Sequence, residues 1–124
     1  MSYFLFALSD SADINDEISP QRAAELVAGG AQLVDVRQDD EYAAGRIEGS
    51  LHIELDQLPA EAAAIDRDRP VVFYCRSGSR SALATQAFRA AGYEAHNLTG
   101  GLIAWKERGL PLEPPNGTVA GPQA

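Results

Sequence analysis

Residues 70–81 read PVVFYCRSGSRS, in which an apolar run leads to a cysteine and a short polar loop follows. A continuous apolar run between turn signals is typical of a strand buried in a parallel sheet. We therefore predict a strand at 70–74 that delivers Cys75 to one edge of the sheet. A helix is predicted over 81–91 with Gly92 at its end, and its apolar side is formed by Leu83, Ala87, Phe88 and Ala91.

Strands and helices alternate on both sides of this stretch. Ser19 is the expected N-cap of a helix that begins with Pro20 and ends at Gly29 and Gly30. The other predicted strands lie at 32–36, 51–53 and 94–98, and the other predicted helices at 39–45, 59–65 and 101–108. This alternation predicts an α/β fold with a mainly parallel sheet and helices on both faces. Ligands of such sheets bind beyond the carboxyl ends of the strands, which is where we expect Cys75.

The composition is that of one ordinary globular domain. The chain has 124 residues, of which 45% are hydrophobic and 23% are charged, and this length can close one core without disulfides. The net charge of −8 argues against nucleic acid or an anionic membrane as a partner. Cys75 is the only cysteine, so no internal disulfide can form. No His/Cys cluster has metal-ligand spacing, so neither a metal nor a cofactor is expected.

The two ends of the chain differ from its middle. The apolar residues 3–8 are too few to span a membrane. No Lys or Arg precedes Arg22, so a signal peptide with a basic start is not expected and cytoplasmic residence is predicted. We predict one domain over residues 1–112, and leave open whether its first residues form an ordered strand. Residues 113–124 are rich in Pro and Gly and are expected to form an irregular, mobile tail.

Residues 75–81 combine features that favour an ionised thiol. Successive backbone N–H groups of such a loop can converge on an anion, and the start of the next helix adds partial positive charge. Arg76 and Arg80 add full positive charges. These effects favour the thiolate form of Cys75 and would also hold an anionic substrate or leaving group. The alternative is an inert core thiol, but a structural cysteine needs no Arg-Ser-Gly-Ser-Arg sequence beside it.

Several motifs in this order resemble those of the rhodanese homology family. They are LVDVR at 33–37, EY at 41–42, GRIEGS at 45–50, VFYCRSGSRS at 72–81 and LTGGLIAW at 98–105. Each motif alone is a weak signal, but their order and spacing together are specific, and the resemblance covers residues 18–112. The family commonly has Gly-His-Ile-Pro-Gly-Ala where this chain has GRIEGS. The difference removes a histidine that could have acted as a base.

The resemblance implies a fold, an activity and a site. The fold would have three layers, with a mainly parallel five-stranded sheet between helices. The activity would be that of a thiosulfate sulfurtransferase, which moves a sulfane sulfur from thiosulfate or a similar small anion through a persulfide on Cys75. The acceptor would be a thiol, which a protein could carry, or cyanide. The backbone amides of the loop would cradle the persulfide, and Arg76 and Arg80 would attract the donor. The substrate-binding residues implied are Arg76, Ser77, Gly78, Ser79 and Arg80.

Two other function classes remain open. A phosphatase or arsenate reductase is disfavoured because four residues separate Cys75 from Arg80, whereas related phosphatases have five. No second cysteine and no catalytic acid of the phosphatase kind can be assigned either. A non-catalytic module would use the same fold to bind a protein partner or to sense redox state, with Cys75 incidental. The sequence leaves the physiological donor and acceptor, the pathway and the oligomeric state open.

The remaining polar residues are assigned structural roles. Asp35 and Arg37 alternate on a strand and therefore share a face, so we expect each to take a structural role in an ion pair or hydrogen bond rather than a catalytic one. His52 and His96 lie in predicted strands away from the loop. Trp105 is expected to anchor the core.

Overall fold

The structure, a computed structural model, describes residues 15–120 of the chain, so the expectation for the first residues lies outside the described part. No helix between Asn15 and Ala120 combines the length and apolar character that a membrane span requires. The elements are β1 (Glu17–Ile18), α2 (Pro20–Ala28), β2 (Gln32–Asp35), α3 (Asp39–Ala44), β3 (Leu51–His52), the 3-10 turn η1 (Leu55–Gln57), α4 (Leu58–Glu61), the 3-10 turn η2 (Ala62–Ala64), β4 (Val71–Tyr74), α5 (Ser79–Ala90), β5 (Ala95–Leu98) and α6 (Gly101–Glu107).

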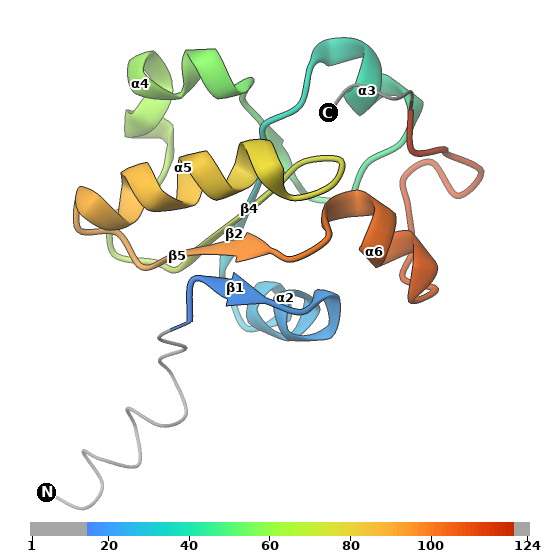
Figure 1. Ribbon diagram of the computed structural model, residues 1–124, viewed down its shortest axis with the longest axis horizontal. Coiled ribbons are helices and arrows are strands. Elements are labelled where there is room, and N and C mark those ends of the chain that lie inside the picture. The colour runs from blue at the N-terminus through green and yellow to red at the C-terminus, as the bar shows by residue number, and fades with distance from the viewer. Residues whose placement is uncertain (1–14, 121–124) are drawn as a thin grey trace, which may run out of the picture.

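Five parallel strands form the centre of the fold in the order β1-β5-β4-β2-β3. Helices lie on both sides of this sheet (Figure 1). α2 and α6 contribute to the hydrophobic core on one face, and α4 and α5 contribute to the core on the other. The predicted α/β fold, with a five-stranded parallel sheet between two layers of helices, is therefore confirmed.

Strand β4 lies in the middle of the sheet, between β2 and β5. All four of its residues are fully buried. Val72 and Tyr74 pack in one core and Val71 and Phe73 in the other, because successive side chains of a strand point to opposite faces. The chain leaves β4 at Cys75, so the thiol lies at the carboxyl edge of the sheet.

Helix α2 forms as its sequence signals predict. The Ser19 side chain accepts a hydrogen bond from the backbone N–H of Arg22 at 3.1 Å, and Pro20 occupies the first turn. Gly29 is the C-cap residue. These signals act within a few residues of one another, so they can be read directly from the sequence.

Helix α5 differs from its prediction in its start and in its buried side. It begins at Ser79, two residues before the predicted start, and its buried residues are Ser81, Ala84, Thr85 and Phe88. Leu83, placed on the apolar side of the predicted helix, is 65% exposed. The hydroxyls of Ser81 and Thr85 are buried instead, and both are hydrogen-bonded there. Ser81 donates to the Cys75 sulfur and Thr85 donates to the Ser81 carbonyl.

The chain after Leu112 is irregular, and residues 113–120 lie against the domain. Arg46 and Glu113 exchange two backbone hydrogen bonds, and the Thr118 N–H donates to the Ala44 carbonyl. Val119 packs on a core cluster. This differs from the predicted mobile tail beginning at 113. The segment lacks an apolar pattern, and it is held mainly by backbone hydrogen bonds that composition does not indicate.

Candidate active site

Cys75 is held at the point where β4 ends and α5 begins. The residue is completely buried, and its Sγ accepts three hydrogen bonds. The donors are the backbone N–H of Gly78 at 3.1 Å, the backbone N–H of Ser81 at 3.5 Å and the Ser81 hydroxyl at 3.4 Å. The first turn of α5, a helix of 12 residues, also directs its partial positive charge toward the sulfur. Sγ therefore lies among hydrogen-bond donors at a helix N-terminus.

The loop after Cys75 is fixed from outside by α6. The N–H groups of Leu102 and Ile103 donate to the carbonyls of Cys75 and Arg76 at 2.9 and 3.1 Å. Gly101 makes this approach possible, because a Cβ at its position would lie 2.4 Å from the Arg76 carbonyl oxygen. The carbonyls of Cys75 and Arg76 thus accept hydrogen bonds from α6, and the N–H groups of the loop are left to donate to the sulfur.

Asn97 of β5 fixes the end of the same loop. Its side-chain amide donates to the Gly78 carbonyl at 3.0 Å and also to the Glu17 carboxylate. Gly78 has a φ of 105°, a left-handed conformation that glycine adopts without strain. Asn97 thereby supports the turn that aims the Gly78 N–H at Sγ.

Four further amides belong to the same loop and helix start. Within residues 15–120, no hydrogen-bond acceptor is found for the backbone N–H groups of Arg76, Ser77, Ser79 and Arg80. Clustered N–H donors of this kind can bind an anion. The loop therefore has the donors to hold charge next to the sulfur of Cys75.

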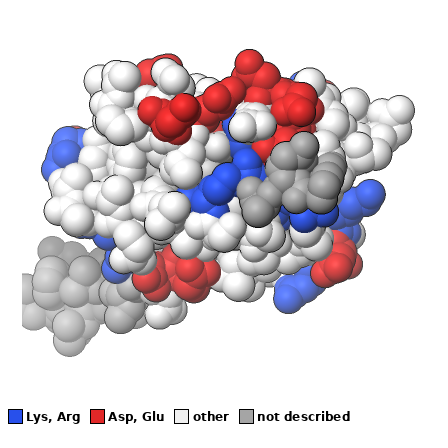
Figure 2. Space-filling model, turned by 45° about the horizontal axis from the view of Figure 1, so that its top comes forward, with Lys and Arg blue, Asp and Glu red and all other residues white. Residues whose placement is uncertain are grey.

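Arg80 is occupied by an ion pair that the sequence did not suggest. Its two terminal nitrogens donate to the two carboxylate oxygens of Glu41 at 2.8 and 2.9 Å. The Glu41 side chain is fully buried, and that of Arg80 is 19% exposed. Arg80 was predicted to attract an anionic donor, and the Glu41 carboxylate would compete with that donor for the guanidinium. In Figure 2, basic side chains gather near the centre of one face of the molecule and acidic side chains border them.

The ion pair determines the ionisation of both groups. Burial tends to raise the pKa of Glu41, but hydrogen bonds from Arg80 and Gln38, with the charges of Arg80 and Arg37, outweigh burial and hold that pKa below its ordinary value. The hydrogen bond to Glu41 raises the pKa of Arg80. Both groups therefore remain charged near neutral pH.

Arg76 contacts the C-terminal segment. Its side-chain Nε donates to the Ala120 carbonyl at 3.2 Å. A carbonyl is neutral, and no carboxylate among residues 15–120 pairs with Arg76, whereas Glu41 pairs with Arg80. The two arginines of the loop, which were predicted to have the same role, therefore differ in their surroundings.

The other polar residues take structural roles. Arg37 and Asp35 are fully buried and form a two-pronged ion pair, with distances of 3.1 and 2.7 Å from Nε and Nη2 to Oδ2. His52 bonds the Arg37 carbonyl and stacks on Tyr42. His96 bonds the Asn15 carbonyl. Trp105 is buried in the core, and its indole N–H donates to the Pro111 carbonyl at 2.8 Å.

One group among the described residues has metal-ligand geometry. Ligand-type atoms of Asp39, His52 and Glu54 lie within 4.8 Å of one another. The Asp39 side chain is 88% exposed, and Nε2 of His52 is already bonded to a carbonyl. Exposed acidic groups alone do not make a metal site, so the expectation that the protein needs no metal stays a prediction.

The sequence interpretation missed four residues that shape the site: Ser81, Glu41, Asn97 and Gly101. Ser81 was assigned to the start of a helix, although a helix start is where free N–H donors lie. Asn97 is a polar residue in a predicted buried strand, and buried polar groups need hydrogen-bond partners. Its position in the sequence could therefore have indicated a hydrogen-bonding role. Glu41 and Gly101 were noted only as parts of motifs.

Comparison with known proteins agrees with this architecture. The Rhodanese-like domain family matches residues 19–108. A sulfurtransferase of Allochromatium vinosum is 40% identical over 106 residues, covering 85% of this chain and 97% of that protein. The thiosulfate sulfurtransferase GlpE of Pseudomonas paraeruginosa is 36% identical, over 77% of this chain and 87% of that protein.

A solved structure has the same fold. The rhodanese-related protein of Thermoplasma volcanium superimposes with a TM-score of 0.73 at 27% identity, covering 77% of this chain and 95% of that one. The family match runs from α2 through α6 and includes Cys75 and its loop. The chain therefore belongs to the rhodanese-like domain family.

Proposed function

We propose that this protein is a sulfurtransferase that carries a sulfane sulfur as a persulfide on Cys75. The observation that carries the proposal is the set of hydrogen-bond donors around Sγ at the start of α5. Relatives named sulfurtransferase and thiosulfate sulfurtransferase, at 40% and 36% identity, support the same reaction class. Thiosulfate is the proposed donor, because it is a small anion with a transferable outer sulfur.

The proposed reaction has two displacement steps. The thiolate of Cys75 attacks the outer sulfur of thiosulfate, a new S–S bond forms, and the old S–S bond breaks with its electron pair leaving on sulfite. The enzyme then carries a persulfide anion. A thiolate or cyanide next attacks the outer sulfur, and the electron pair of the enzyme S–S bond returns to Sγ. The cycle needs no external oxidant or reductant, and dividing one transfer into two steps is the advantage of covalent catalysis.

The loop supplies the electrostatics of both steps. The Gly78 and Ser81 N–H groups hold Sγ, and the amides of Arg76, Ser77, Ser79 and Arg80 would hold the outer sulfur and its negative charge. The charge of Arg76, which no carboxylate of the described residues pairs with, would attract the donor. We assign Arg80 a positioning role through its ion pair with Glu41, which ties the start of α5 to α3.

Phosphate chemistry is less well supported by this site. A guanidinium binds a phosphate best through two parallel hydrogen bonds, and the two terminal nitrogens of Arg80 are already bonded to Glu41. The four-residue spacing between Cys75 and Arg80 also gives a smaller ring than the five residues of related phosphatases. Both features favour a sulfur atom over a tetrahedral oxyanion.

The test compares the wild type with Cys75→Ser after treatment with thiosulfate. The intact mass of the wild type should increase by one sulfur atom, and added cyanide should remove that sulfur as thiocyanate. The Ser variant, shown by circular dichroism to be folded, should do neither. Thiocyanate production by the folded Ser variant would exclude the mechanism. If thiosulfate and a panel of persulfide donors leave the wild type without an adduct, the non-catalytic module becomes the better reading.

A further inference from the structure

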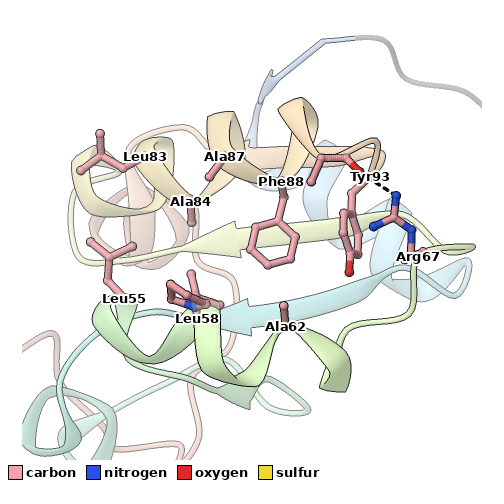
Figure 3. Close-up of a pocket in the computed structure, with 11 residues that line it drawn as sticks. Leu55, Leu58, Ala62, Arg67, Leu83, Ala84, Ala87, Phe88 and Tyr93 are labelled. Atoms are coloured by element: carbon pink, nitrogen blue, oxygen red, sulfur yellow. Dashed lines mark hydrogen bonds between the residues drawn. The ribbon is translucent and has the colours of Figure 1, made fainter.

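An apolar groove runs between α5 and the segment formed by η1, α4 and η2. Its volume is about 530 Å³, which lies in the range of ligand-binding clefts. Leu55, Leu58 and Ala62 face Ala84 and Phe88 across the groove, and Leu83 stands at its edge (Figure 3). Leu83 is 65% exposed, so a large apolar side chain of α5 is open to water here.

The two polar side chains at the groove, Arg67 and Tyr93, lie together at one end of it (Figure 3). The Arg67 guanidinium donates to the Ala91 carbonyl at 2.6 Å and lies 4.7 Å from the centre of the Tyr93 ring. The Tyr93 hydroxyl bonds the Ile65 carbonyl. A polar small molecule needs placed polar groups to orient it. The groove therefore fits an apolar peptide better than an anion or a sugar.

The chain itself contains such a peptide. Residues 3–8 read YFLFAL, with no charged side chain, in a protein that carries 18 Asp and Glu residues. These residues lie outside the described structure, which begins at Asn15. Residues 9–14 read SDSADI and connect the two. The sulfur-transfer site described above gives the apolar segment no role.

The position where the described chain begins brings this segment within reach. The Asp16 carboxylate accepts a hydrogen bond from Gln86 of α5 at 2.9 Å, so the chain enters beside the helix that forms one wall of the groove. Six linking residues can span about 20 Å when extended, whereas a helix with its side chains is about 10 Å across. The linker is long enough to pass over α5 to the groove.

We propose that residues Tyr3–Leu8 bind in the groove between α4 and α5 of the same chain. The match rests on an apolar, uncharged segment, a groove whose lining is apolar except for Arg67 and Tyr93, and a linker of sufficient length. Attachment to the same chain raises the effective concentration of the segment to the millimolar range, which favours its own groove over that of a second copy. The proposal does not depend on the sulfur-transfer reaction.

The test is photo-crosslinking in the full-length protein. A benzophenone amino acid replaces Phe6, and peptide mass spectrometry locates the crosslinks after irradiation. We expect crosslinks to residues 55–62 and 83–91 in a product with the mass of one chain. The same protein with Leu83→Glu should lose these crosslinks by about tenfold, because a charged side chain at the edge opposes apolar contact. The matched control is Leu51→Glu, which changes an exposed leucine of β3 outside the groove.

A second measurement does not depend on the probe. In methyl NMR spectra, Phe4→Ser should shift the signals of Leu55, Leu58 and Leu83, and leave those of Leu98 and Leu102 in the opposite core unchanged. Crosslinks elsewhere, or equal crosslinking in Leu83→Glu, would overturn the proposal. Crosslinks joining two chains would instead assign the groove to a second copy. Unchanged groove signals in Phe4→Ser would show that the segment binds elsewhere.

Discussion

Replacing Gly45 by alanine tests how the C-terminal segment is held. Gly45 ends α3 in an extended conformation that any residue can adopt, so the substitution introduces no backbone strain of its own. A Cβ at this position would lie 2.4 Å from the Thr118 carbonyl oxygen and 2.8 Å from the Thr118 nitrogen. These are backbone atoms and cannot rotate away. We expect Gly45→Ala to push residues 117–120 off the domain.

The contacts at risk set the size of the effect. They are the hydrogen bond from the Thr118 N–H to the Ala44 carbonyl at 2.9 Å, the bond from Arg76 to the Ala120 carbonyl, and the packing of the partly buried Val119. Each hydrogen bond contributes about 1 kcal/mol net, and partial burial of a valine contributes about as much. The free energy of unfolding should therefore fall by about 2–3 kcal/mol.

A double-mutant cycle isolates this cause. Urea unfolding is measured for the wild type, Gly45→Ala, a chain truncated after Glu113, and the truncated chain carrying Gly45→Ala. If the alanine acts only through the C-terminal segment, its cost should fall below about 0.5 kcal/mol in the truncated chain. An equal cost in both chains would refute the reasoning. The cost would then be assigned to the hydrogen bond from Arg37 to the Gly45 carbonyl.

Two further predictions concern the ion pair and the loop. Glu41→Gln should lower the free energy of unfolding by about 3 kcal/mol at pH 7, because it leaves Arg80 without its carboxylate; Asp39→Asn, an exposed change in the same helix, is the control. The folded-state pKa of Glu41 lies below its ordinary value, so the stability that its ionised form contributes is complete above about pH 4.3 and is lost as pH falls through the folded pKa. Urea titrations should therefore show that acidification lowers the free energy of unfolding less in Glu41→Gln than in the wild type. Equal decreases in the two proteins would contradict the assignment. Inserting one Gly between Ser77 and Gly78 should lower kcat/KM for thiosulfate by at least about tenfold, because misaligned donors lose transition-state stabilisation. Retention of wild-type turnover by the insertion variant, with folding checked by circular dichroism, would show that loop size does not determine the preference for sulfur.

The central strand and its loop could be predicted because their signals are local. The apolar run at 70–74, the cysteine that follows it and the cap at Ser19 each depend on a few adjacent residues. The pairing of Glu41 with Arg80 could not be found in this way, since the two lie 39 positions apart in the sequence. Only the packing of α3 beside the start of α5 brings them together.

The errors have a physical cause as well. Leu83, Ala87, Phe88 and Ala91 were placed on one apolar side of α5, and burial of apolar side chains is the usual rule; yet Ser81 and Thr85 are buried and Leu83 is exposed. A buried hydroxyl costs little when it is hydrogen-bonded, and both hydroxyls have partners. The side of α5 that carries Ser81 and Thr85 therefore faces the interior, and Leu83 lies at the edge of the apolar groove.

The two arginines of the loop show why charge counted along the sequence is a poor guide to charge at a site. Arg80 lies in the first turn of α5, but the buried carboxylate of Glu41 offsets its charge. Within residues 15–120, the side chain of Arg76 bonds a neutral carbonyl, that of Ala120, and pairs with no carboxylate. The positive potential at Cys75 should therefore come from the backbone N–H groups of the helix start and from Arg76. Because the C-terminal segment holds the Arg76 side chain, we expect that segment to influence how an anionic donor reaches the thiol.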